Sequence, residues 1–117
     1  MINRQELLDR FGDTEFLLLL WRKTEKEIPE RLKEIDGRLK APPPYDREAL
    51  VASLHKLRGL LANFLTTGNS VSMLVQCENA VLVQNFEALL ETWPAFRTTL
   101  DGEILELNRW LEANSTL

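Results

Sequence analysis

The sequence predicts an all-α fold, an antiparallel four-helix bundle with a short N-terminal capping helix. Apolar residues recur at intervals of three and four along most of the chain, which places them on one face of each helix. Segments rich in glycine or proline interrupt this pattern and separate successive helices. No strand-like alternation, internal repeat or low-complexity tract competes with this interpretation.

The first two helices are separated by Gly12. Asn3, with a glutamate three residues later, fits the reciprocal cap of a short helix that covers one end of the bundle. Asp13 is the expected N-cap of the long second helix. Leu18 and Leu19 fall outside the main apolar stripe of that helix, so we expect them to pack beneath the N-terminal helix.

The second helix combines an apolar stripe with a charged face. The stripe comprises Leu17, Trp21, Ile28, Leu32, Ile35 and Leu39. It continues through Pro29, so we expect the proline to bend the helix without ending it. On the charged face, Glu27 has the i,i+4 spacing of a surface salt bridge to both Lys23 and Arg31, which is typical of a solvated face.

The segment 37–45 is the clearest break in the helical pattern, because three consecutive prolines favour an extended connector. Its Pro-Pro-Pro-Tyr sequence at 42–45 also matches the short motif bound by WW domains, although matches of four residues are frequent by chance. Asp46 is the expected cap of a third helix, which Gly68 ends. The apolar stripe of this helix comprises Leu50, Leu54, Leu57, Leu61 and Phe64.

Two further helices complete the predicted bundle. Ser70 starts the fourth helix, and Thr92, just before a Trp-Pro pair, is expected to separate it from the last one. The apolar residues of the fourth helix are Val71, Leu74, Val75, Leu82, Phe86 and Leu89, and those of the last are Phe96, Leu100, Ile104, Leu107 and Leu111. Met73, Cys77 and Ala80 widen the apolar face of the fourth helix, which indicates either a central position or a self-association surface.

Length and charge exclude several classes of function. The 117 residues suffice for one compact core, so we expect 1–117 to form a single domain. A net charge of -4 argues against nucleic acid, whose phosphates require a basic face. The longest apolar run, 16–21, is too short to cross a membrane, and the N-terminus lacks a signal-peptide core, so we expect a cytoplasmic protein. The single cysteine, Cys77, is expected to be buried and inert.

The most informative segment surrounds the only histidine, His55. At about 100° per residue, His55 lies far from the apolar stripe of its helix, and Ala52, Gly59 and Ala62 share its outward face. An ordinary solvent face would carry long polar side chains, and a glycine inside a helix costs about 1 kcal/mol relative to alanine. We therefore interpret Ala52, Gly59 and Ala62 as a partner-docking surface that allows another molecule to approach the histidine.

The sequence around this histidine resembles the signature of histidine phosphotransfer (HPt) domains. In that family the histidine is followed by a hydrophobic residue at +2, a lysine at +3 and a glycine at +4, often with Ala-Asn further on. The chain reads His-Lys-Leu-Arg-Gly at 55–59 and Ala-Asn at 62–63. The Leu-Asp-Arg-Phe-Gly sequence at 8–12, the long helix with an internal proline and the leucine-rich last helix extend the resemblance over nearly the whole chain.

The resemblance implies a phosphoryl carrier of a two-component phosphorelay, with His55 as the phosphoacceptor. Its partners would be response-regulator receiver domains and an upstream hybrid sensor kinase. An exposed imidazole is largely neutral and nucleophilic at cellular pH, as this role requires. Arg58 takes the place of the family lysine, where we expect it to be hydrated and to support the phosphoryl group by charge alone, with Lys56 adding to the field. The resemblance implies no cofactor or metal of its own, because the Mg²⁺ belongs to the receiver, and we expect a monomer.

Other functions fit these residues less well. A metal site would need further His or Cys ligands, and a hydrolase would need a nucleophile with an orienting partner. No glycine-rich nucleotide-binding segment is present, so we expect no autokinase activity. Without the motif, a surface histidine with no role would be the default. A pseudo-HPt adaptor, which binds a receiver or regulator without phosphotransfer, stays open as the alternative, because Leu60, Leu61 and Leu65 replace small residues of the family and would make the surface more apolar.

Overall fold

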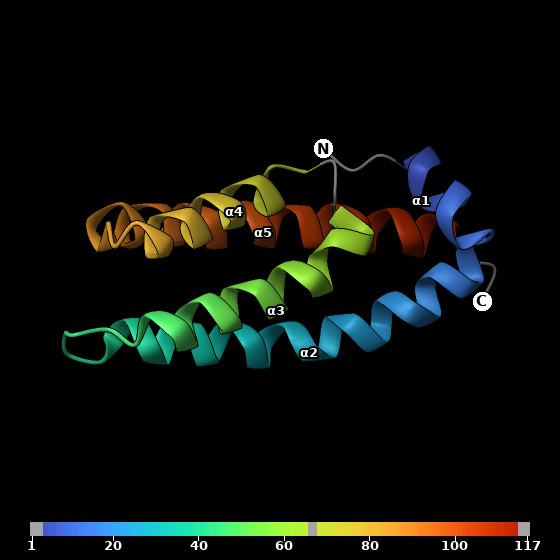
Figure 1. Cartoon of the computed structure of the whole chain (residues 1–117). Helices are drawn as coiled ribbons and strands as arrows, with labels where there is room; N and C mark the ends of the chain where they lie inside the picture. The colour runs from blue at the N-terminus through green and yellow to red at the C-terminus, as the bar shows by residue number, and fades with distance from the viewer. Residues whose placement is uncertain (1–3, 66–67, 115–117) are drawn as a thin grey trace.

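The computed structural model describes residues 4–65 and 68–114, and the regular structure within them is entirely helical. Five helices follow one another: α1 (Arg4–Phe11), α2 (Thr14–Lys40), α3 (Arg47–Leu65), α4 (Asn69–Leu82) and α5 (Phe86–Asn114). The longer helices lie alongside one another in an elongated body of 50 × 21 × 20 Å (Figure 1). The prediction of an all-α protein is confirmed.

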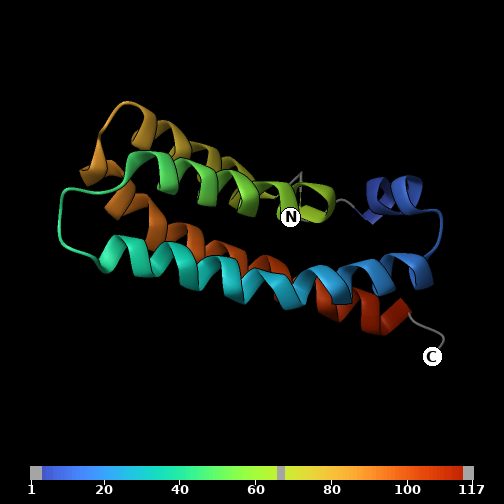
Figure 2. The same cartoon turned by 60° about the horizontal axis from the view of Figure 1, so that its bottom comes forward.

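Each of the longer helices packs against its neighbours through its apolar stripe. α3 contacts α2 on one side and α4 on the other, while α5 contacts α4 and α2. α1 lies at the end of the molecule where α2 begins and α5 ends (Figure 2). The largest fully buried side chains are Trp21, Phe96, Leu17, Ile35, Leu50, Leu54, Leu57, Leu61, Leu65, Leu74, Leu89 and Leu100. Burial of this apolar surface is the main force that holds the helices together.

The predicted caps of α2 and α3 are present. The Oδ1 atoms of Asp13 and Asp46 accept the backbone N–H three residues later, at 2.7 Å and 3.1 Å. Each bond satisfies one of the N–H groups that the first helical turn leaves without a partner. Gly12 has a φ of +87°, a left-handed conformation that allows the chain to turn from α1 into α2. The predicted cap at Asn3 lies outside the described residues.

α1 packs toward α3, which changes the expected environment of the first turns of α2. Phe11 stacks on Phe64 of α3 with ring centroids 5.2 Å apart. Leu18 is half-buried against the core, but Leu19 is 69% exposed, so the prediction that both pack beneath the N-terminal helix was wrong for Leu19. One residue rotates a helix by about 100°, so Leu18 and Leu19 point in different directions, and only Leu18 reaches the core.

α2 is longer than predicted. It passes Pro29 as expected but also continues through Gly37, so the connector begins at Ala41 rather than at Gly37. A single glycine costs a helix about 1 kcal/mol, which is too little to end one that continues to bury apolar side chains. In the connector, the half-buried ring of Tyr45 packs on Phe86 with centroids 5.0 Å apart. The tyrosine of the WW-type motif therefore anchors the connector to α5.

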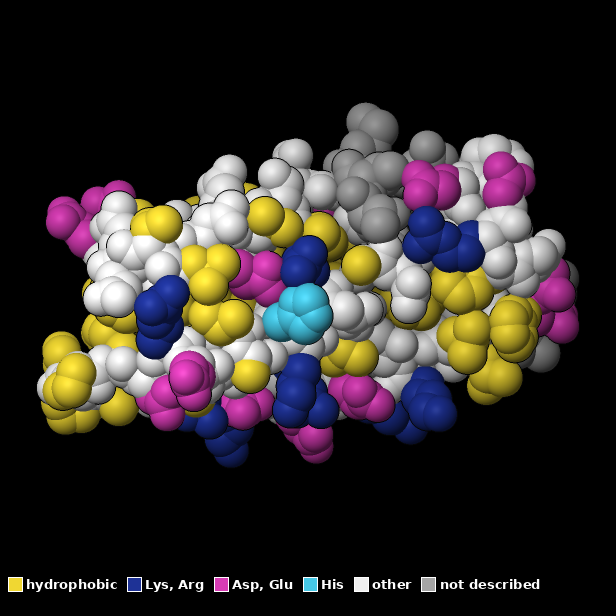
Figure 3. Space-filling model, in the orientation of Figure 1, with side chains coloured by type: hydrophobic (Ala, Val, Ile, Leu, Met, Phe, Trp, Pro, Cys, Tyr) yellow, Lys and Arg dark blue, Asp and Glu magenta, His cyan; other side chains and the backbone are white. Residues whose placement is uncertain are grey.

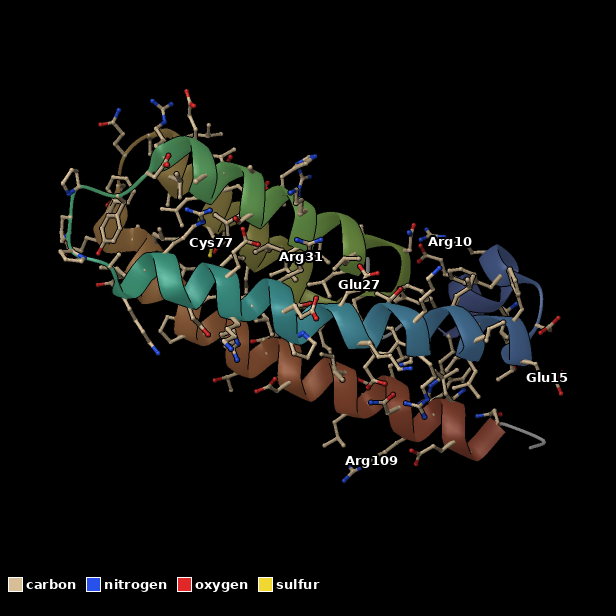
Figure 4. All side chains as sticks on the ribbon, turned by 90° about the horizontal axis from the view of Figure 1, so that it is seen from below. Arg10, Glu15, Glu27, Arg31, Cys77 and Arg109 are labelled. Carbon is tan, nitrogen blue, oxygen red and sulfur yellow. The ribbon has the colours of Figure 1, made fainter. Side chains whose placement is uncertain are left out.

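The charged face of α2 forms salt bridges that differ from the predicted ones. Arg31 pairs with Glu34 at 3.7 Å rather than with Glu27, and both Arg31 and Glu27 lie on the side of α2 that faces α3 (Figure 4). Glu34 also accepts a hydrogen bond from Ser53 of α3 at 3.2 Å. Among the described residues, no ion pair joins Lys23 to Glu27. Glu34 therefore joins a salt bridge within α2 to a hydrogen bond with α3.

The boundary between α4 and α5 lies earlier than predicted. α4 ends at Leu82, so Phe86 and Leu89 belong to α5 and not to α4. The chain turns at Gln84, whose φ is +59°, and Asn85 caps α5 by accepting the N–H of the residue three positions later at 3.2 Å. The apolar period runs across this turn, which is why the pattern alone did not reveal it.

The Trp-Pro pair that was expected to start the last helix lies inside α5. Pro94 is exposed within the helix, where it removes one backbone hydrogen bond. Trp93 compensates through tertiary contacts, because its Nε1 donates to Oδ1 of Asp36 at 2.7 Å. Arg97 donates to the other oxygen of Asp36 at 2.5 Å. These contacts join α5 to α2 on both sides of the proline, so Thr92 does not mark a break.

The wide apolar face of α4 is part of the core. Cys77 is fully buried, Ala80 is 8% exposed and Met73 packs against the core. The suggested self-association surface formed by these residues is therefore wrong, and the central position is correct. Burial raises the pKa of the Cys77 thiol to about 12, so the thiolate is scarcely populated, as the prediction of an inert cysteine requires.

The N-terminus of α4 is capped by a side chain from α5. Gly68 is the N-cap residue, and it leaves room for Glu103, because a Cβ at this position would lie 1.6 Å from Oε1 of that side chain. Glu103 accepts the N–H of Ser70 at 2.9 Å and its hydroxyl at 3.1 Å. Burial raises the pKa of the Glu103 carboxyl, and the two hydrogen bonds from Ser70 oppose this shift.

We expect Glu103→Gln to change the pH dependence of stability. Because the folded-state pKa of Glu103 is above its ordinary value of 4.5, its contribution to stability is present at low pH and lost as the pH rises through the folded-state pKa. Glutamine has no charge and keeps an acceptor for the N–H of Ser70. The variant should therefore gain stability relative to the native protein as the pH rises toward neutrality. Thermal melts over this range measure the difference, and a stability difference between variant and native protein that does not change with pH would contradict it.

Candidate functional site

His55 lies on the outward face of α3, as the sequence predicted. Its side chain is 70% exposed, whereas Leu54 and Leu57 beside it are fully buried. Figure 3 shows the histidine in the open, with basic side chains above and below it. The core-facing leucines fix the rotation of α3 about its axis, and this rotation places the imidazole in solvent.

Two of the three positions predicted to form the docking surface are exposed and carry small residues. Ala52 and Gly59 are exposed, and a Cβ built on Gly59 would meet nothing within 4 Å. Ala62 differs, because it is half-buried and its carbonyl oxygen accepts a hydrogen bond from Arg10 of α1 at 3.4 Å. The open surface therefore extends over Ala52 and Gly59, while α1 borders it at Ala62.

Arg58 is in direct contact with the histidine. Its Nη2 lies 2.9 Å from Nδ1 of His55, and its Nε lies 3.0 Å from Oε2 of Glu78. The side chain is 35% exposed, so the expectation of a hydrated arginine was wrong. Lys56 is exposed, and within the described parts of the chain no ion pair involves it. The structure thus brings Arg58 to the imidazole but leaves Lys56 free to contribute only through its charge.

Glu78 is a site residue that the sequence reasoning missed. It lies on α4 with its side chain 10% exposed, and Oε1 is 3.7 Å from Nδ1 of His55. This oxygen is buried and has no hydrogen-bond partner. A buried charge without a partner is costly, so the ion pair with Arg58 explains how the carboxylate is tolerated. One signal was available in the sequence: Glu78 is the only charged residue of α4.

A groove opens beside His55 toward the start of α3. It has a volume of about 820 Å³, and its apolar wall includes Val51, Ala52 and Leu82. Arg47 closes one side of it and donates to the carbonyl oxygen of Leu82 at 2.9 Å. Leu82 is 47% exposed, so its side chain is accessible from the groove. The groove is also lined by Asp46 and Glu48, so the histidine borders a surface with apolar groups and charges of both signs.

Two of the three leucines that distinguish the chain from the HPt pattern are core residues. Leu61 and Leu65 are fully buried, and Leu60 is half-buried. Leu61 and Leu65 therefore cannot make the surface more apolar, and the argument that they favour an adaptor was wrong.

Neither of two comparisons with known proteins identifies a relative: no protein-family model matches the chain, and no curated protein gives a significant match. Among residues 4–65 and 68–114, no helix is long and apolar enough to cross a membrane. No three His, Cys, Asp or Glu side chains in these ranges come together as metal ligands would. The geometry around His55 and the resemblance of its sequence to HPt domains are therefore the observations that bear on function.

Proposed function

We propose that this protein is a histidine phosphotransfer protein of a two-component phosphorelay, built as an antiparallel four-helix bundle and working in the cytoplasm. It would accept a phosphoryl group from the aspartate of one receiver domain, supplied by an upstream hybrid sensor kinase, and donate it to another. The observation that carries the proposal is the environment of His55: a 70% exposed imidazole whose Nδ1 faces Arg58 and Glu78. This orientation leaves Nε2 as the nitrogen available to a partner.

Phosphoryl transfer requires two things of this protein: a positioned nucleophile and a positive charge close to the phosphoryl oxygens. The lone pair of Nε2 forms a bond to phosphorus while the bond from phosphorus to the aspartate oxygen of the receiver breaks, and the electron pair leaves with the carboxylate. Negative charge on the phosphoryl oxygens is stabilised by cationic donors. Arg58 lies within reach of the imidazole, and Lys56, which follows His55 in the sequence, is exposed. The Mg²⁺ of such a reaction is expected in the receiver domain.

The surface beside the histidine supports docking of a folded partner. Ala52 and Gly59 leave space on both sides of His55 along α3, and the neighbouring groove offers the apolar side chains of Val51 and Leu82. A receiver domain must bring its aspartyl phosphate to within bonding distance of Nε2. Long side chains at positions 52 and 59 would keep the two surfaces apart.

The direct test is transfer of phosphate from a receiver domain. Receiver domains encoded in the same genome are phosphorylated with a radioactive small-molecule donor, freed of that donor and mixed with this protein. We expect an acid-labile, base-stable label on the protein, as a phosphohistidine requires. Binding of a receiver without label would instead indicate an adaptor, and an acid-stable label would contradict the proposal.

We expect Gly59→Gln to slow transfer without unfolding the protein. Open space surrounds this position, so the glutamine side chain fits but projects into the space that a docked receiver would occupy. Gly102→Gln is a matched control, because Gly102 also lies in a helix with nothing within 4 Å of an added Cβ, and it is on α5, away from His55. Both variants should melt at or above the native temperature, since glycine is a poor helix former. Native transfer rates for Gly59→Gln would show that this position is not part of the docking surface.

A further inference from the structure

Two side chains compete for the same nitrogen of His55. Arg58 Nη2 lies 2.9 Å from Nδ1, and Glu78 Oε1 lies 3.7 Å from it. A guanidinium carries only donors and a carboxylate only acceptors, so the two contacts require opposite states of Nδ1. Contact with Arg58 requires a lone pair on Nδ1, which places the proton of the neutral ring on Nε2. Contact with Glu78 requires the proton on Nδ1, which leaves the lone pair on Nε2.

We propose that Arg58 and Glu78 form a tautomer switch that makes His55 nucleophilic only when a phosphoryl group is present. This inference rests on the proposed function and adds a positioning role for both residues. At rest, Arg58 donates to Nδ1 and Nε2 carries the proton, so the exposed nitrogen cannot attack. A docked phosphoryl group draws Arg58 toward its oxygens. Nδ1 then donates to Glu78, and the lone pair on Nε2 faces the phosphorus.

The second hydrogen-bond state is already prepared in the resting structure. Oε1 of Glu78 is buried without a hydrogen-bond partner, and it is the carboxylate oxygen that lies 3.7 Å from Nδ1. A small rotation of the exposed imidazole would bring the two atoms within hydrogen-bond distance. Arg58 Nε also has no hydrogen-bond partner, although it lies 3.0 Å from Oε2, so the guanidinium is held by charge and not by ideal geometry. The Arg58 side chain can therefore move toward a docked phosphoryl group without breaking a hydrogen bond to Glu78.

The switch conserves atoms and charge. Nε2 is exposed to solvent with the rest of the ring, so it releases its proton to water while Nδ1 takes one up, and the ring stays neutral. In the transfer step the Nε2–P bond forms, the P–O bond to the aspartate breaks, and the proton on Nδ1 stays hydrogen-bonded to Glu78. The developing positive charge on the ring is then next to a carboxylate, which stabilises it.

The single histidine makes the switch directly measurable, because the ¹⁵N NMR spectrum of the histidine-labelled protein contains one imidazole. At alkaline pH, where the ring is neutral, the spectrum reports which nitrogen carries the proton. We expect the proton on Nε2 in the native protein and on Nδ1 in Arg58→Met, which removes every donor but keeps a long side chain. The tautomer ratio should change about tenfold or more, as expected for a hydrogen bond to a charged group.

Two further variants isolate the role of Glu78. Arg58→Met combined with Glu78→Leu replaces the buried ion pair with apolar side chains and should return the proton to Nε2, because no acceptor then faces Nδ1. Lys56→Met removes a neighbouring charge that does not contact the ring and should leave the native tautomer. Circular dichroism establishes that each variant is folded, and Arg58→Ala replaces Arg58→Met if the latter is not.

The outcomes separate the switch from the proposed function. A proton that stays on Nε2 in folded Arg58→Met or Arg58→Ala, or one that is already on Nδ1 in the native protein, would overturn the switch. These spectra are recorded without phosphate, so they do not depend on transfer. If receivers label His55 but the tautomer does not respond to Arg58, only the switch fails. If the tautomer responds as expected but no receiver labels His55, the phosphotransfer function fails.

Discussion

His55→Gln should abolish labelling by a phosphorylated receiver completely. The variant removes the only imidazole of the chain, and glutamine offers an amide nitrogen that is not nucleophilic. Because the side chain is 70% exposed, the fold should tolerate the change. The melting temperature should stay close to that of the native protein, since exposed substitutions usually change stability by about 0.5 kcal/mol or less.

The measurement compares native protein and variant in the same transfer reaction, followed by acid and alkaline treatment of the labelled protein. Binding of the variant to the receiver serves as the control, because Ala52 and Gly59 are unchanged and docking should persist. Retention of label on a folded His55→Gln protein would place the phosphoryl group on another residue and end the phosphohistidine assignment.

The apolar periodicity predicted the helices and the faces that they bury, because core packing and sequence period are linked by helix geometry alone. The boundaries were predictable where a side chain caps the helix, as at Asp13 and Asp46. They were not predictable at Pro94, because tertiary contacts of Trp93 and Arg97 with Asp36 stabilise a helix around a residue that usually interrupts one. Sequence patterns around Pro94 do not reveal this, because Asp36 is distant in the sequence.

The same distinction applies to the site. The position of His55 and the open space at Gly59 follow from the stripe of one helix, so the sequence was sufficient. A residue at +3 is rotated by about 300°, which places Arg58 to one side of His55. The sequence does not say which helix occupies that side. α4 does, and this is why Glu78 and the contact it makes with Arg58 became visible only in three dimensions.

Arg58→Ala should reduce the rate of transfer from a phosphorylated receiver by about 10- to 100-fold, because a hydrogen bond to a charged group contributes about 1.5 to 3 kcal/mol when it is made. Arg58→Lys should keep most of the native rate, since a lysine provides the charge that the phosphoryl oxygens require. A lysine cannot contact both His55 and Glu78 at once, as Arg58 does. In the proposed switch Arg58 leaves His55 before transfer, so the loss of this double contact should have little effect on the rate.

The experiment follows forward transfer from one phosphorylated receiver to the native protein, Arg58→Lys and Arg58→Ala, at two salt concentrations. Raising the salt concentration should lower the transfer rates of the native protein and of Arg58→Lys more than that of Arg58→Ala. The positive charge at position 58 that salt screens is present in the first two proteins and absent from the third. Arg58→Ala also leaves Glu78 buried without its cation, so its melting temperature should fall, and rates are compared only below the onset of unfolding. A folded Arg58→Ala protein as fast as the native one at low salt would show that Arg58 has no part in transfer, and the role of the cation would pass to Lys56.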